Sequence, residues 1–196
     1  VGAFAAGIFH VFTHAFFKAC LFLAAGSVIH ALHHEEDVFK MGGLRKKMPL
    51  TWFGYAMATL AIAGVIPWAG FFSKDEILYM TFVAGQGSTV HLILWIIGII
   101  TAAFTAFYMG RSLFLAFHGK TRLGKETHAH HETDAHEGEH DDHHAVTYDK
   151  VHESPISMTG VLVVLGVASL VVGWLNIPKG LISLGDYNGM FHHFLA

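Results

Sequence analysis

Three ionisable residues, His10, His14 and Lys18, lie inside an apolar run near the start of the chain. They are four residues apart, so on an α-helix they follow one side and rise about 6 Å per step. Ionisable side chains are costly inside a bilayer and are functional by default. Histidine titrates near neutral pH, and burial disfavours the charged form of lysine, so both can exchange protons. We interpret the three as a proton relay; the alternative is that they only tie helices together.

A second charged group consists of Lys74, Asp75 and Glu76. In an ordinary protein such a group simply begins a helix, because acidic residues favour the first turn. Ser73 directly precedes the group and would cap that helix, with Glu76 at the capping-box position.

The apolar stretch before this group can be placed in a membrane in two ways. Either residues 50–72 span the membrane and the charges mark its far surface, or residues 51–84 form one span that breaks near 64–72. Pro67 would interrupt the helix in the second case. Broken helices at membrane depth occur only where they are buried in protein or line a wet cavity, so this interpretation implies a polar path. The pattern alone leaves both open.

The composition indicates a membrane protein. The chain has 196 residues, of which 53% are hydrophobic and 14% charged, against about 25% charged residues in soluble domains. The mean hydropathy is +0.47. A net charge of −3 without a basic patch gives no indication of nucleic-acid binding. The single cysteine, Cys20, cannot hold an iron–sulfur cluster.

We predict an all-α fold, a polytopic bundle of transmembrane helices. The expected segments are a helix at 1–32, a loop at 33–50, a helix at 51–84, a helix at 91–117, a polar histidine-rich loop at 118–154, a helix at 155–176 and a tail at 177–196. The chain opens on Val1 with no charged segment before the apolar run. We therefore interpret it as a fragment of a longer protein and expect no signal peptide.

The basic residues set the expected orientation. Lysine and arginine gather in the 33–50 and 118–154 loops and are absent from 85–91. By the positive-inside rule, the two basic loops are cytoplasmic and the tail lies on the opposite side. Within the second basic loop, residues 127–146 alternate histidine with acids. Such tracts can bind Zn²⁺, Ni²⁺ or Cu²⁺, but no tetrahedral ligand spacing stands out, and we expect a solvated, disordered loop.

Three stretches carry a resemblance to a known family. They are HVFTHAFFKACLFLAAGSVIH (His10 to His30), MGGLRKKMPLT (Met41 to Thr51) and GVIPWAGFFSKDEIL (Gly64 to Leu78). The sequence resembles subunit L of respiratory complex I, the antiporter-like, proton-pumping subunit of NADH:quinone oxidoreductase. The resemblance covers the later part of such a subunit. That family often has two prolines at the helix break, where this chain has Pro67-Trp68.

The resemblance implies a role for each charged residue. His10, His14 and Lys18 match the connecting residues of the family's second half-channel. Lys74 matches the lysine at the break, the terminal proton-loading residue, with Asp75 beside it. The resemblance therefore favours the broken-helix interpretation and a fragment of the larger antiporter-like fold.

The resemblance also implies partners and a location. We expect a subunit of a proton-translocating enzyme complex, with no cofactor, no metal and no redox chemistry in this chain. Its partners would be the other membrane and peripheral subunits of complex I and the lipid bilayer, not nucleic acid. We expect a multi-pass protein of the bacterial inner membrane. The alternative is a subunit of an Mrp-type Na⁺/H⁺ antiporter, and a third interpretation is a metal-handling membrane protein built around the histidine-rich loop.

Overall fold

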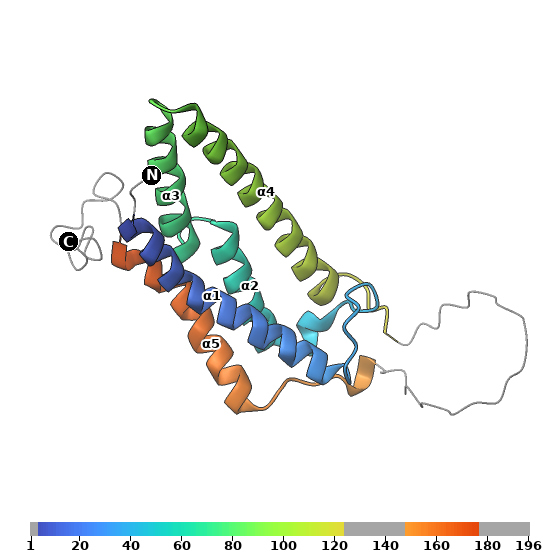
Figure 1. Cartoon of the computed structure of the whole chain (residues 1–196). Helices are drawn as coiled ribbons and strands as arrows, with labels where there is room; N and C mark the ends of the chain where they lie inside the picture. Colours follow the sequence, from blue (N-terminus) through green and yellow to red (C-terminus); the bar gives the residue numbers. More distant parts are fainter. Residues whose placement is uncertain (1–3, 124–147, 177–196) are drawn as a thin grey trace, which may run out of the picture.

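The computed structural model describes residues 4–123 and 148–176, and all regular structure in these residues is helical (Figure 1). The elements are α1 (Phe4–Ala31), the 3-10 turn η1 (Leu44–Lys46), α2 (Pro49–Ala63), α3 (Ala69–Gly85), α4 (Thr89–Phe117), η2 (Tyr148–Lys150), α5 (Ile156–Val171) and η3 (Val172–Asn176). The predicted all-α fold with one discontinuous helix is confirmed. Most of the histidine-rich loop and the whole tail lie outside the described residues.

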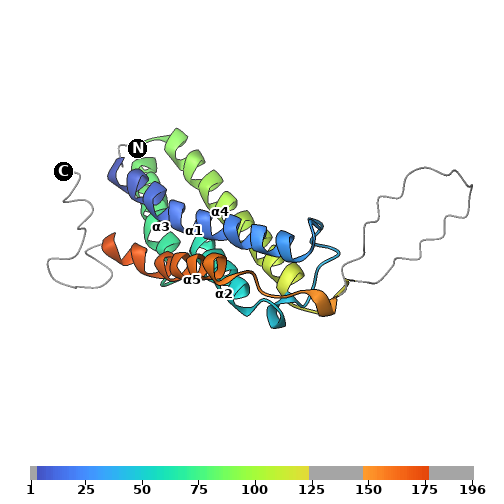
Figure 2. The same ribbon diagram turned by 90° about the horizontal axis from the view of Figure 1, so that it is seen from below.

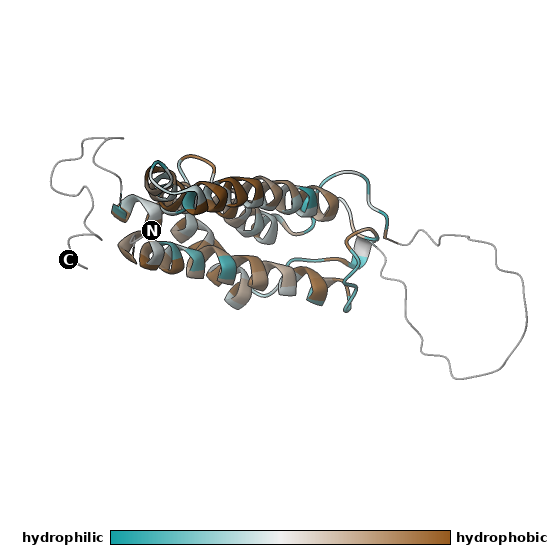
Figure 3. Ribbon diagram, turned by 45° about the horizontal axis from the view of Figure 1, so that its top comes forward, coloured by the Kyte–Doolittle hydropathy of each residue, from teal (hydrophilic) through white to brown (hydrophobic). Residues whose placement is uncertain are grey.

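Three of the described helical segments are long and apolar enough to cross a membrane. They are Phe4–Ala31, Thr89–Phe117 and Ile156–Asn176. The α2 helix has 15 residues and α3 has 17, and each falls short of the roughly 20 residues that one crossing needs. That the two form one crossing in two parts stays a prediction. Hydrophobic residues predominate along the helices (Figure 3).

The break between α2 and α3 occupies residues 64–68. The α2 helix ends at Ala63, and its C-cap Gly64 has a φ of 78°, in the left-handed region that glycine adopts without strain. The α3 helix then begins at Ala69. The expectation that Ser73 caps this helix is wrong, because the helix resumes earlier. Ser73 lies in its second turn, where its hydroxyl donates to the carbonyl of Ala69 at 3.2 Å.

Close packing joins α1, α2 and α5. A Cβ on Gly166 of α5 would lie 3.4 Å from the Cα of Gly54 on α2, so the absence of side chains lets the two helices approach. The buried thiol of Cys20 on α1 has its single hydrogen within reach of two carbonyls, that of Gly54, 3.3 Å from the sulfur, and that of Leu162, at 3.6 Å. The α4 helix packs on α2 and α3 and leans away from α5 (Figures 1 and 2).

A polar network fixes one end of this bundle. The hydroxyl of Ser27 lies 2.9 Å from that of Thr51 and 2.6 Å from that of Ser154. The carboxylate of Glu153 accepts hydrogen bonds from the Thr51 hydroxyl and from the amide of Leu50, the latter at 2.8 Å. The carboxylate therefore caps the first turn of α2 from a position about a hundred residues later in the chain.

The two basic loops meet at the same end. The guanidinium of Arg122 donates to the carbonyl of Met41 at 2.7 Å and to that of Leu115 at 2.9 Å. The hydroxyl of Tyr148 donates to the carbonyl of Gly43 at 3.0 Å. The segment between α1 and α2 is thereby held against the end of α4 and the segment before α5. Which side of a membrane this end faces stays a prediction.

Candidate functional site

A histidine and two hydroxyl groups join α1 to the first turns of α3. The Nδ1 atom of His10 lies 3.1 Å from the Oγ of Ser73, and the hydroxyl of Thr13 donates to the same Oγ at 2.9 Å. Thr13 and Ser73 are fully buried. If the hydroxyl proton of Ser73 points to the carbonyl of Ala69, His10 must donate; if it points to His10, the ring accepts. The contact suits either protonation state of the ring.

The three predicted relay residues of α1 do not all face this contact. A spacing of four residues exceeds one helical turn by about 40°, so the row winds around the helix. The ring centroids of His10 and His14 are 6.0 Å apart. His14 packs edge-on against Phe17, and the ammonium of Lys18 lies 5.7 Å from the ring centroid of Phe22. All three relay residues are partly buried. The row runs from the α3 contact towards the edge of the bundle.

The ammonium of Lys74 caps the end of α2. It donates to the carbonyls of Ile62, at 2.9 Å, and Ala63, at 3.2 Å. These are the last carbonyls of the helix, where the helix dipole is negative and a cation is stabilised. Gly64 leaves room for the lysine, since a Cβ there would lie 2.9 Å from the Cε of Lys74. At the break, the partly buried ammonium of Lys74 is therefore hydrogen-bonded to backbone carbonyls of α2.

The structure brings part of the predicted site together. The neighbours Ser73 and Lys74 place the α1 histidine and the end of α2 on the same turn of α3. Asp75 follows them but is exposed, and it forms no hydrogen bond with any of the residues that the structure describes. His14 and Lys18 lie further along α1, away from the break.

A segment that the sequence did not single out covers the break. The Nε1 of Trp174 donates to the carbonyl of Pro67 at 3.1 Å, and the amide of Asn176 donates to the carboxylate of Glu76 at 3.0 Å. Both donors belong to η3, and Asn176 is buried. A polar side chain, that of Asn176, at the end of an apolar run was the available signal in the sequence. The sequence did not show which segment this side chain would contact.

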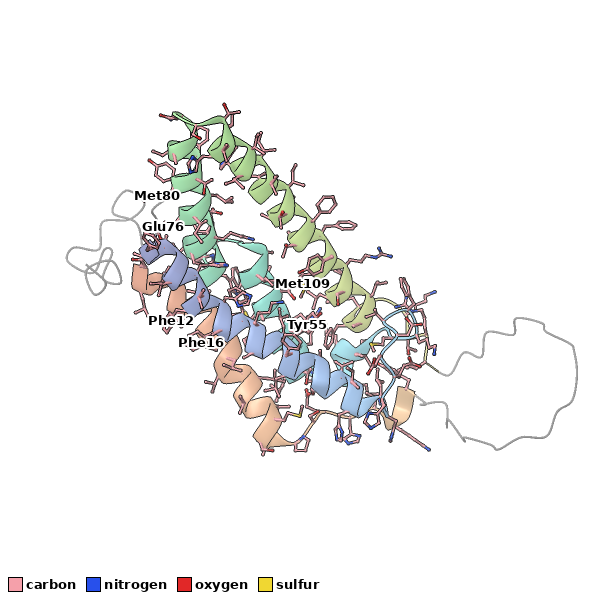
Figure 4. All side chains as sticks on the ribbon, viewed as in Figure 1. Phe12, Phe16, Tyr55, Glu76, Met80 and Met109 are labelled. Carbon is pink, nitrogen blue, oxygen red and sulfur yellow. The ribbon has the colours of Figure 1, made fainter. Side chains whose placement is uncertain are left out.

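Larger side chains pack between α2 and α4. The hydroxyl of Tyr55 lies 2.8 Å from that of Ser112, and the buried Met109 packs in the same region (Figure 4). Phe12 and Phe16 form an edge-to-face pair on α1, with centroids 5.3 Å apart.

No cluster of three or more metal-ligating side chains occurs within residues 4–123 and 148–176. The histidine-rich tract at 127–146, for which we expect a solvated loop, lies outside the described residues.

The fold and the site define an antiporter-like membrane subunit, and comparison with known proteins gives the family. The model of the family described as "NADH:quinone oxidoreductase/Mrp antiporter, TM" matches residues 1–107, more than half of the chain. The chain belongs to this family and is a multi-pass membrane protein, as the sequence predicted.

Individual relatives agree with the predicted resemblance to subunit L. The chain is 42% identical, over 195 residues, to NADH-quinone oxidoreductase subunit L of Rickettsia bellii, covering 100% of this chain and 26% of the relative. It is 44% identical, over 190 residues, to NAD(P)H-quinone oxidoreductase chain 5 of a Picosynechococcus species, covering 92% and 27%. The chain thus spans about a quarter of these relatives, and the resemblance is confirmed.

The fold also resembles a solved structure. A chain of the Mrp complex from Dietzia sp. DQ12-45-1b superposes with a TM-score of 0.64 at 22% identity. The match covers 86% of this chain and 34% of that one. The likeness confirms the antiporter-like fold.

Proposed function

We propose that this chain is the part of a complex I subunit L that holds the second half-channel for protons. The observation that carries the proposal is the Lys74 ammonium on the broken end of α2, one residue from the Ser73 hydroxyl that contacts His10. A structural role alone would not require titratable groups from two helices at one break in an apolar bundle.

The geometry supports a sequence of steps from the break outwards. Lys74 holds a proton while two of its three ammonium N–H groups bond the α2 carbonyls, so the third N–H can pass a proton on without breaking these bonds. Ser73 can then pass a proton to or from His10, because its hydroxyl both donates and accepts. Between His10 and His14 the 6.0 Å between ring centroids leaves room for transfer through a bridging water. Lys18, one turn further, is the end of the row. The exposed Asp75 beside Lys74 supplies a nearby acceptor.

Redox energy would come from elsewhere in the complex. We expect NADH oxidation and quinone reduction in partner subunits, with no cofactor in this chain. A change of charge in a neighbouring membrane subunit would shift the protonation of Lys18, at the edge of the bundle, and through it that of the histidines and Lys74. Other membrane and peripheral subunits are therefore the expected partners.

One alternative has an observation in its favour. The fold likeness to the Mrp complex and the joint family description fit a subunit of a Na⁺/H⁺ antiporter equally well. A metal-handling role rests on residues 127–146 alone, and nothing in the described residues supports it.

The test uses the full-length protein in its native membranes. Inverted vesicles that contain it should take up protons when NADH is oxidised, and deletion of its gene should lower the protons moved per NADH. If deletion leaves that ratio unchanged and instead abolishes proton exchange driven by a sodium gradient, the antiporter alternative is right and the proposal is wrong.

A further inference from the structure

One side of α4 is an exposed apolar surface that carries a single charge near its C-terminal end. Its members recur every three or four residues, which places them on one face of the helix. All of them are exposed: Val90, Ile93, Ile97, Ile100, Phe104, Phe107, Arg111 and Phe114. Arg111 is the one Lys, Arg, Asp or Glu residue in the helix.

The two sides of α4 differ in side-chain size. On the packed side, Gly98 lies so close to α3 that a Cβ would approach the Cδ2 of Leu78 to 2.8 Å, and Ala116 is buried. Helices associate within membranes through such small residues, because these let the backbones approach. The exposed face consists mainly of large residues, with the exposed Ala103 beside them. Its chemistry fits lipid acyl chains rather than a neighbouring helix.

Arg111 is placed to meet a lipid headgroup. It stands six residues before the end of α4, about 9 Å inside, at the end of the bundle where the two basic loops meet. Its guanidinium carbon lies 5.7 Å from the ring centroid of Phe39, a residue of the first basic loop that is 59% exposed. Phe107, Tyr108 and Phe114 flank it on the helix and are also exposed. Aromatic residues of this kind gather at the membrane interface.

No carboxylate among the described residues forms an ion pair with Arg111. The nearby loop carboxylate of Asp37 accepts a hydrogen bond from the amide of Phe39 at 2.8 Å, and that of Glu35 pairs with Lys40 at 3.0 Å. The planar donors of the Arg111 guanidinium match the geometry of a phosphate.

We propose that Arg111 and the aromatic side chains around it bind the phosphate of an anionic phospholipid, whose acyl chains lie along the exposed face of α4. Charge decides the class of lipid, because a zwitterionic headgroup brings its own cation to the phosphate and an anionic headgroup does not. The site is separate from the break and from the α1 histidines.

The test is photo-crosslinking of the full-length protein in vesicles of equal parts phosphatidylethanolamine and phosphatidylglycerol. A benzoylphenylalanine at Phe104, two turns from Arg111, would sample acyl chains beside the site, and the same probe at Val90 would sample the far end of α4. Mass spectrometry of the adducts identifies the intact lipid. At Phe104 we expect phosphatidylglycerol to be enriched about fivefold over the ratio at Val90, the size expected for one basic residue at an anionic surface.

Variants keep the inference falsifiable. Arg111→Gln should return the ratio at Phe104 to that at Val90, and Arg111→Lys should keep part of the enrichment because the charge remains. Equal lipid ratios at both positions in the wild-type protein would overturn the proposal. So would adducts at Phe104 that are mainly peptides, since a protein partner would then cover this face.

Discussion

Replacing Lys74 and Lys18 by methionine should affect the stability of the protein very differently. Methionine keeps the length of the side chain and removes its charge and donors. At Lys74 the change leaves the carbonyls of Ile62 and Ala63 without their donor. A hydrogen bond to a charged group contributes about 1.5–3 kcal/mol. Because the site is only partly buried, water can replace part of this, and we expect a net loss of about 2–4 kcal/mol.

At Lys18 the corresponding loss is small. Its ammonium makes a cation–π contact with the exposed ring of Phe22, worth about 0.5–1 kcal/mol at such a site. Loss of a costly charge inside the membrane offsets this. The net change in the free energy of unfolding should be near zero.

The assay is thermal denaturation of the purified full-length protein in detergent, for the wild type and each methionine variant. The midpoint for Lys18→Met should match that of the wild type, and the midpoint for Lys74→Met should lie several degrees lower. Equal midpoints for both variants would refute the capping role of Lys74. A larger fall for Lys18→Met would show that the edge of the bundle, not the break, carries the more important cation.

Three further outcomes follow from the geometry. Gly64→Ala should destabilise the protein by at least the 1–2 kcal/mol of a left-handed alanine, whereas Gly110→Ala, where a Cβ meets nothing within 4 Å, should be neutral or stabilising in the same thermal assay; equal effects would contradict this. Ser73→Ala should clearly lower proton transport by vesicles and have only a smaller effect on stability. Undiminished transport would show that this hydroxyl is not part of the proton path. Cysteines within residues 126–148 should react with reagent from the cytoplasm and those within 85–88 from the opposite side; labelling from one side only would overturn the predicted orientation.

The sequence was sufficient to predict the elements and the interrupted helix. Long apolar runs and Pro67 mark them, because a bilayer demands continuous apolar segments and a proline removes a backbone donor. Hydropathy could not choose between a break and a membrane surface at Lys74. The resemblance to subunit L favoured the break, and the structure interrupts the helix between Ala63 and Ala69. The capping prediction for Ser73 was wrong because its local pattern is common to caps and to buried contacts. In this chain, a tertiary contact uses the hydroxyl.

The contacts that build the site were beyond local patterns. His10 and Ser73 are 63 residues apart, and Lys74 reaches carbonyls 11 and 12 residues earlier across the break. Glu153 caps α2 from a similarly remote position. Each depends on how whole helices pack, which period and spacing do not specify. The spacing of His10, His14 and Lys18 predicted that they share one side of a helix. It could not predict that the row they form turns away from α3 towards the edge of the bundle.

Proton uptake by vesicles that contain the assembled complex with full-length Lys74→Met tests the central claim most directly. NADH oxidation drives the uptake, and subunit content shows whether assembly is normal. We predict that the normally assembled variant moves a small fraction of the wild-type protons per NADH. Lys18→Arg should behave similarly, because arginine holds its proton. Wild-type proton uptake by assembled Lys74→Met would contradict the account, since the lysine at the break would then only cap a helix.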